Sequence, residues 1–155
     1  MQDTRIAPYE QKKPRKIKPY EHKAHYYETD KMGIVHHSNY IRWMEEARTD
    51  FLNQNGCGYA KFEAFGVVSP VLSLSCQYKR STTFEDEIRI HVRLVRYTGI
   101  RLTFRYTMTD ICTGETVFIG ESEHCFLGQN GCPVMVMKRF PAFHEILKGL
   151  TAEEK

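Results

Sequence analysis

The sequence has no apolar run that approaches the roughly 20 residues a helix needs to cross a membrane. Its first residues are polar and basic and do not form the apolar segment of a secretory signal. We therefore expect no membrane span and a cytoplasmic location.

An excess of charge of one sign is also missing. The 155 residues include 22 lysines and arginines against 19 aspartates and glutamates, a net charge of +3, so we expect no nucleic-acid partner. The stretch 1–16 is the exception, because basic residues crowd it. We interpret it as a solvated tail rather than a nucleic-acid-binding arm. The following residues, 17–150, are enough for one domain with its own core.

Cysteine is present but unpaired. There are five cysteines, an odd number, and none form a C-x-x-C pair. This pattern argues against a disulfide framework and a thiolate zinc site, and it favours small buried side chains. A cysteine nucleophile stays open as an alternative, and it would need a lowered thiol pKa.

One long helix is predicted from Asn39 onward. Apolar residues recur there at helical spacing, at Tyr40, Met44, Ala47 and Phe51. Ser38 or Asn39 can cap its start and Gly56 can end it. We expect Met44 and Ala47 to face a sheet.

The rest of the chain has the alternation and turn residues of β-structure. A strand is predicted at Tyr20–Tyr27, before the helix. The strands predicted after it are Val67–Tyr78, Glu87–Tyr97, Arg101–Thr109, Thr116–Leu127 and Val134–Lys138, followed by a short helix at Phe140–Leu150. We interpret the strands after the helix as hairpin-linked neighbours. The fold class is therefore α+β, with an antiparallel sheet against one long helix.

A spaced motif adds a resemblance to a known family. It consists of Tyr27-Glu28-Thr29-Asp30, Gly33-Ile34-Val35, His37-Ser38-Asn39-Tyr40 and Glu46-Ala47-Arg48. This order resembles the hot-dog thioesterases of the 4-hydroxybenzoyl-CoA and YbgC-like type. The resemblance implies an antiparallel five- or six-stranded sheet wrapped around one long central helix. It also implies an acyl-CoA substrate, no cofactor, and a homodimer or homotetramer with active sites between paired subunits.

Asp30 is the first candidate catalytic residue. Thioester hydrolysis needs a carboxylate that attacks the carbonyl or removes a proton from water. Asp30 lies at a predicted strand end ahead of the Gly33 turn, where its side chain can face a cleft. The alternative is that Asp30 only caps the turn, as aspartate often does. The resemblance favours catalysis.

His37 and Tyr27 complete the predicted catalytic set. The resemblance implies that His37, seven residues after Asp30, orients the thioester or water or shuttles a proton. Its neighbour His36 has the weaker claim, because adjacent residues of an extended chain point in opposite directions. Tyr27 can help through its hydroxyl, with aromatic core packing as the alternative.

The remaining candidate ligands in the sequence are those for a metal ion and for the phosphates of a substrate. Asp30, His36 and His37 are poorly spaced to converge on one ion, so we expect no metal there. Coenzyme A carries phosphates, and Arg80, Arg96 and Arg101 lie at predicted strand ends or turns from which they can reach them.

The predicted function is hydrolysis of an acyl-CoA thioester, with Asp30 as nucleophile or general base. Two alternatives stay open: an acyl-ACP thioesterase, and a non-catalytic protein that binds acyl thioesters. A dehydratase of the same fold would be expected to carry a different histidine and acid arrangement on its helix, and the aspartate before Gly33 argues against it.

Overall fold

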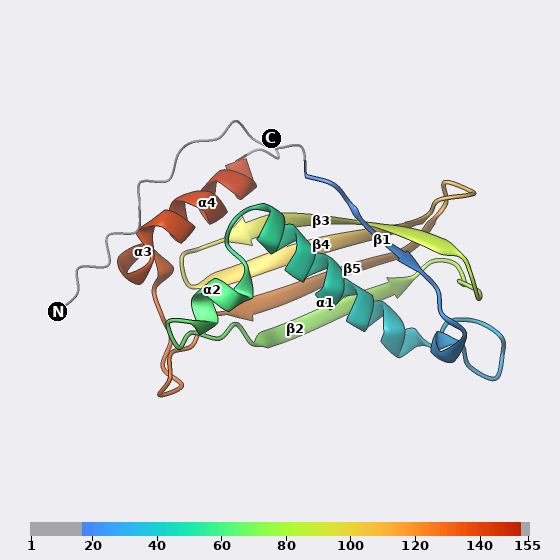
Figure 1. Cartoon of the computed structure of the whole chain (residues 1–155), viewed down its shortest axis with the longest axis horizontal. Helices are drawn as coiled ribbons and strands as arrows, with labels where there is room; N and C mark the ends of the chain where they lie inside the picture. Colours follow the sequence, from blue (N-terminus) through green and yellow to red (C-terminus); the bar gives the residue numbers. More distant parts are fainter. Residues whose placement is uncertain (1–16, 153–155) are drawn as a thin grey trace.

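The computed structural model describes residues 17–152, so the predicted basic tail, 1–16, lies outside the described part of the chain. Five strands form one antiparallel sheet in the order β1-β3-β4-β5-β2 (Figure 1). The strands are β1 (Tyr20–Lys23), β2 (Val71–Tyr78), β3 (Glu87–Tyr97), β4 (Arg101–Asp110) and β5 (Thr116–Cys125). The prediction of an antiparallel sheet with one long helix is confirmed, and five strands are described.

The long helix α1 (His37–Gln54) lies across one face of this sheet (Figure 1). It begins two residues earlier than predicted, because the ring nitrogen Nδ1 of His36 accepts a hydrogen bond from the Ser38 backbone N–H at 3.2 Å and caps the helix. The predicted caps, Ser38 and Asn39, lie inside the first turn instead. At the other end Gly56 has φ +77°, a left-handed conformation that ends the helix as expected.

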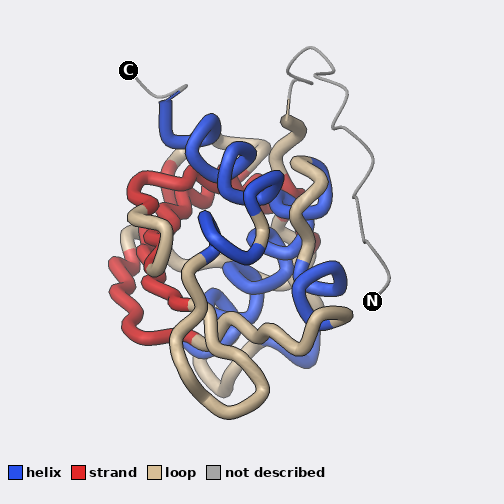
Figure 2. The backbone as a smooth tube through the Cα atoms, turned by 90° about the vertical axis from the view of Figure 1, so that its left-hand side faces the viewer, coloured by secondary structure: helices blue, strands red, loops and turns tan. Residues whose placement is uncertain are grey.

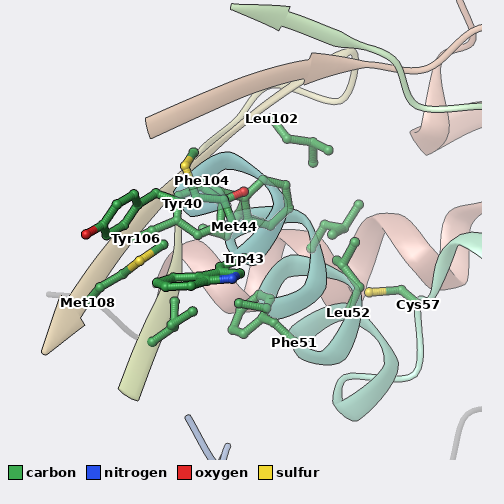
Figure 3. Close-up of a cluster of buried hydrophobic side chains, with 14 of the residues drawn as sticks. Tyr40, Trp43, Met44, Phe51, Leu52, Cys57, Leu102, Phe104, Tyr106 and Met108 are labelled. Atoms are coloured by element: carbon green, nitrogen blue, oxygen red, sulfur yellow. The ribbon is translucent and has the colours of Figure 1, made fainter. Parts of the chain in front are cut away.

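The core lies between α1 and the central strands. Met44 and Ala47 are buried, as predicted, and the alternate residues of β4 from Leu102 to Met108 turn their side chains toward α1 (Figure 3). Helices lie on one side of the strands (Figure 2). Burying a large apolar side chain such as Met44 or Phe104 contributes about 1.5–3 kcal/mol to the stability of the fold.

Two predicted strands are wrong in part or whole. Only Tyr20–Lys23 of the first is a strand, and residues Tyr26–Glu28 form the 3-10 helix η1 instead. The segment predicted as a last strand, Val134–Lys138, overlaps the single helical turn α3 (Val136–Arg139) instead. Just before it, Pro133 makes one isolated bridge to Leu127. A short apolar run such as the four residues from Val134 to Met137 suits a strand or a buried helical turn equally well.

The prediction of consecutive hairpins holds for β3–β4 and β4–β5 and fails between β2 and β3. Strand β2 pairs with β5 at one edge, whereas β3 lies beyond β5 and β4 and pairs with β1. The connecting stretch 79–86 is too long for a tight hairpin turn and has neither glycine nor proline. It instead crosses the end of the sheet, where Thr83 bridges to Ile34.

The remaining helices close one end of the core. Helix α4 (Pro141–Ala152) agrees with the predicted closing helix, and proline suits its first turn because no backbone N–H is needed there. Phe143 of α4 packs on Phe62 of the short helix α2 (Tyr59–Glu63), which was not predicted. Across residues 17–152 no helix combines the length and the apolar character that a membrane span requires.

Candidate active site

The segment from η1 to the first residue of α1 carries the predicted catalytic residues. The backbone N–H of Asp30 donates to the Ile34 carbonyl at 2.8 Å, and the Gly33 N–H donates to the Asp30 carbonyl at 2.9 Å. Gly33 has φ +78°, which favours glycine at this turn. A bridge between Thr29 and Val35 joins the two sides of the loop. Asp30 therefore lies in a short, internally bonded turn just ahead of α1.

Asp30 is half-buried, and one of its carboxylate oxygens holds this turn. Oδ1 accepts a hydrogen bond from the Met32 backbone N–H at 2.8 Å. The turn-capping alternative is therefore real. Within residues 17–152, Oδ2 accepts no hydrogen bond, so one oxygen of the carboxylate is left to meet a substrate or a water molecule. Capping and catalysis are compatible in this geometry.

Glu28, two residues before Asp30, was given no role by sequence analysis. Its side chain is 5% exposed. Oε1 accepts from the His25 backbone N–H at 2.7 Å and lies 2.8 Å from Nε2 of His22. Oε2 accepts from Nε1 of Trp43 at 2.6 Å. Burial raises the pKa of a carboxyl group, but these hydrogen bonds outweigh it and the pKa of Glu28 lies below its ordinary value.

The Glu28 backbone also fastens the loop to α1. Its carbonyl accepts from the His36 backbone N–H and from Nδ2 of Asn39, both at 2.8 Å. Together with the bond from Trp43, these contacts attach η1 to the first two turns of the helix. The position of Asp30 is therefore set by its neighbour Glu28 as well as by its own turn.

The two adjacent histidines, His36 and His37, differ in exposure and in structural role. His36 caps α1, whereas the side chain of His37 is exposed at the first helical residue. The rings lie 4.1 Å apart between centroids. The Tyr78 hydroxyl donates to the His37 carbonyl at 2.9 Å and so joins the end of β2 to the start of α1. His37 and Asp30 thus lie at the same end of the sheet, and the proposed chemical role of His37 stays a prediction.

Tyr27 is 82% exposed, so the core-packing alternative is wrong for it. Its ring stacks on His25 with the centroids 5.1 Å apart and an angle of 12° between the planes. A contribution of its hydroxyl to catalysis stays a prediction.

The three predicted phosphate-binding arginines lie at opposite ends of the sheet. Arg80 follows β2 at the Asp30 end, and Arg96 and Arg101 flank the β3–β4 turn at the other end. Arg80 and Arg101 form exposed ion pairs, with Glu115 at 3.2 Å and with Glu123 at 2.8 Å. Exposed pairs of this kind are weak enough to exchange for a phosphate. Within the described chain, residues 17–152, the three arginines are not brought together.

A hollow of about 610 Å³ lies close to the β3–β4 turn. Lys138 and Arg139 of α3 line it together with polar residues of the loop after β5, and its lining contains no acidic residue. The Val136 backbone N–H donates to the Gly99 carbonyl at 3.1 Å, which places α3 beside that turn. This cationic hollow was not predicted, because Lys138 belongs to a segment that we interpreted as a strand and the lining also includes Phe65 from a distant part of the chain.

A second buried charge, Arg48, lies farther along α1. Its Nε donates to the Tyr59 hydroxyl at 2.7 Å and its Nη1 to the Tyr106 hydroxyl at 2.9 Å. Ser122 extends this series of hydrogen bonds, with its Oγ 2.7 Å from the Tyr106 hydroxyl and 2.7 Å from Nε2 of His124. Burial, then the charge of Arg48, lowers the pKa of His124 to about 4, so its ring is neutral at neutral pH.

The cysteines are free in the structure. Cys57 is buried, and burial raises the pKa of its thiol to about 12. Cys57 is therefore a poor nucleophile, as expected for a cysteine that acts as a small apolar side chain. The prediction of buried cysteines holds for Cys57 and Cys125 and is wrong for Cys112 and Cys132, which are exposed in loops.

A five-stranded antiparallel sheet around one long helix, with a half-buried carboxylate in the loop before that helix, has the architecture expected of a hot-dog thioesterase. Comparison with known proteins agrees. The family model of the thioesterase-like superfamily matches residues 25–149, and the chain belongs to that superfamily.

Individual relatives are similar over most of the chain. The predicted acyl-CoA thioesterase YneP of Bacillus subtilis strain 168 is 33% identical over 120 residues, which cover 77% of this chain and 86% of YneP. The crystal structure of a DHNA-CoA thioesterase from Staphylococcus aureus superposes with a TM-score of 0.83 at 31% identity, covering 89% of this chain and 95% of that one. The acyl-CoA thioester hydrolase YbgC of Escherichia coli O157:H7 is 25% identical over 101 residues, which cover 65% of this chain and 73% of YbgC.

Proposed function

We propose that the protein hydrolyses acyl-CoA thioesters and that Asp30 is its catalytic carboxylate. The observation that carries the proposal is the half-buried Asp30 carboxylate, with one oxygen bound to its own turn and the other unengaged, in a chain of the thioesterase-like superfamily. The names of YneP, YbgC and the Staphylococcus aureus enzyme support the choice of a CoA thioester as substrate.

Two chemical routes fit this carboxylate. In the first, Oδ2 attacks the thioester carbonyl, the C–S bond breaks, the thiolate leaves and takes up a proton, and water cleaves the resulting anhydride. In the second, Oδ2 removes a proton from a water molecule as the water oxygen attacks the carbonyl, and the thiolate leaves as before. Both routes yield the free acid and coenzyme A. His37 and the Tyr27 hydroxyl are proposed to orient the thioester or to move the proton.

We also propose that the active unit is a dimer formed through β2. This strand pairs on one side only, with β5, so its outer edge carries unpaired backbone N–H and C=O groups. Its apolar side chains are 42–48% exposed, an unusual exposure for residues of these types: Val71, Leu72, Leu74 and Tyr78. Pairing of two β2 strands would cover both the edge and these side chains.

An antiparallel pairing of this kind explains how distant features of one chain serve one site. A two-fold axis beside β2 sets its end at Tyr78, near His37, against the beginning of the partner's β2. The cationic hollow lies close to that beginning, because Leu127 bridges to Val68 just before the strand. Coenzyme A can then run from Asp30 toward the hollow of the partner, where Lys138 and Arg139 meet its phosphates. Arg96 and Arg101 are proposed to contribute from the adjoining turn, and Arg80 from the Asp30 side.

The test is a thiol-release assay over a panel of acyl-CoAs, with each acyl group also presented on acyl-carrier protein and on a short thiol without phosphates. We expect turnover of acyl-CoA, and a higher KM for the phosphate-free thioester because it cannot bind the cationic hollow. Turnover of the carrier-protein substrate alone would favour an acyl-ACP thioesterase. Tight binding without thiol release would identify a non-catalytic binding protein.

Mass in solution tests the dimer. We expect light scattering at catalytic concentrations to give two or four chains, and Leu74→Lys in β2 to lower both the mass and the activity, because a charge would enter the paired surface. The matched control is Thr107→Lys on β4, which lies in the middle of the sheet. A fully active monomer would contradict the shared site.

A further inference from the structure

Three potential metal ligands meet beside the segment that carries Asp30. They are His22 at the end of β1, His25 just after it, and Glu28 in η1, and their ligand atoms all lie within 4.8 Å of one another. Nε2 of His22 is 2.8 Å from Oε1 of Glu28. This group differs from Asp30, His36 and His37, for which the sequence predicted no metal. Across residues 17–152, only the group at Glu28 brings three such side chains together.

Neighbouring side chains orient the two buried ligands, His22 and Glu28. Nδ1 of His22 lies 3.6 Å from Oε2 of Glu46, and that oxygen accepts a hydrogen bond from the Tyr20 hydroxyl at 3.0 Å. Oε2 of Glu28 is held by Nε1 of Trp43. Each ligand therefore turns one atom toward the common point, while the other atom faces a neighbour: Glu28 Oε2 accepts a hydrogen bond from Trp43, and His22 Nδ1 faces the Glu46 carboxylate at ion-pair distance. Metal-binding histidines and carboxylates are commonly oriented in this way.

The surroundings give the cluster one closed side and one open side. The indole ring of Trp43 packs on the His22 ring with the centroids 4.6 Å apart, which closes the inner side. His25 is exposed, so a cation can approach from solvent. The buried carboxylate of Glu28 supplies the negative charge that a divalent cation requires.

We propose that His22, His25 and Glu28 bind one divalent cation of the zinc class, with water as a fourth ligand. Two imidazoles and one carboxylate form a ligand set that zinc accepts, and three protein ligands leave one position open. The cation takes the place of the proton shared between His22 and Glu28, and it ties β1 to η1, two residues before Asp30. The proposed hydrolysis at Asp30 does not use the ion, so the metal-site proposal can be tested independently of the proposed function.

The experiment is a calorimetric titration of metal-free protein with Zn²⁺. We expect one site per chain, and at least a tenfold loss of affinity in His25→Ala, where the exposed ring can be removed without disturbing the buried pair. Glu46→Gln should weaken binding about 10–100-fold, because it removes the group that orients His22. Glu45→Gln is the matched control on the same helix and should bind Zn²⁺ normally.

Thermal unfolding gives a second readout that does not depend on activity. Zn²⁺ should raise Tm of the parent protein and of Glu45→Gln, and it should have little effect on His25→Ala. Two results would overturn the proposal. One is the absence of saturable binding, which would leave Glu28 and His22 as a hydrogen-bonded pair only. The other is binding that survives in His25→Ala and is lost in His37→Ala, which would place the ion at the adjacent histidines.

Discussion

Two buried charges lie along the same helix and are stabilised in opposite ways. The Glu28 carboxylate packs against the first turns of α1 and accepts hydrogen bonds from a backbone N–H, an indole and an imidazole. The Arg48 guanidinium lies farther along α1 and donates to the tyrosine hydroxyls of Tyr59 and Tyr106. We call these the Glu28 cluster and the Arg48 cluster.

The two clusters also differ in the chain distance that they span. The Glu28 cluster draws its side chains from residues 22–43, and it adjoins the loop of Asp30. The Arg48 cluster joins α1 and α2 to β4 and β5, and it ends at His124 inside the sheet. The Glu28 cluster therefore positions the loop that carries Asp30, whereas the Arg48 cluster stabilises the packing of helix on sheet.

The largest expected effect comes from the apolar layer between the clusters. Met44 is fully buried on α1, between Trp43 and Arg48. Met44→Asp places a carboxylate there without a partner and should reduce the free energy of unfolding by about 4 kcal/mol or more. Chemical denaturation measures the change, with Ile41→Asp on the exposed face of the same helix as the control. A soluble Met44→Asp protein with an unchanged Tm would contradict the assigned face.

The Arg48 cluster predicts a loss of stability in mild acid. The pKa of His124 is about 4 in the folded protein, against about 6.5 in an unfolded chain. Between these values the unfolded state binds more protons, so the free energy of unfolding should fall as the pH decreases from about 6.5 to 4, by about 3 kcal/mol in all.

The pH dependence also separates the two clusters. The pKa of Glu28 is lowered, so its stabilisation is complete above the ordinary carboxyl pKa and is lost only as the pH falls through the lower folded value. Denaturation curves across this range should therefore show the His124 effect first. His124→Gln should flatten the curve between pH 6.5 and 4, and an unchanged slope in that variant would assign the effect to another group.

The smallest change in shape, Glu28→Gln, tests the division of roles. An amide cannot accept all three hydrogen bonds as a carboxylate does, so the free energy of unfolding should fall by about 1–3 kcal/mol. Because Glu28 also holds the Asp30 loop, kcat should fall in the folded protein. Arg48→Met is the comparison: it should cost similar stability while kcat stays close to the parent value. Equal losses of kcat in the two variants would show that the clusters do not differ in role.

The sequence was informative where its pattern is local. The alternation from Leu102 to Met108 and the helical spacing from Tyr40 to Phe51 predicted a strand and a helix that the structure confirms. The motif around Asp30 led to the correct family. Each of these signals lies within one continuous stretch of the sequence, the longest being the motif from Tyr27 to Arg48.

The sequence was uninformative where contacts are distant or the pattern is ambiguous. In the sequence Glu28 is one more acidic residue near Asp30. The neighbouring residues do not indicate that Trp43 and His22 surround its side chain. Arg48 meets Tyr106 across 58 residues, and no spacing rule predicts that contact. The crossing of β2 to the far edge was missed because alternation gives strands and not their order.

The central claim is that the Asp30 carboxylate performs thioester hydrolysis, and Asp30→Asn tests it most directly. Asparagine keeps an oxygen that can accept from the Met32 N–H, so the turn and Tm should be preserved while the carboxylate is lost. The measurement is thiol release from the best acyl-CoA by the parent protein and by Asp30→Asn, with Tm measured alongside. We predict that kcat falls by about two orders of magnitude or more at an unchanged Tm. Near-normal turnover by a well-folded Asp30→Asn protein would contradict the account.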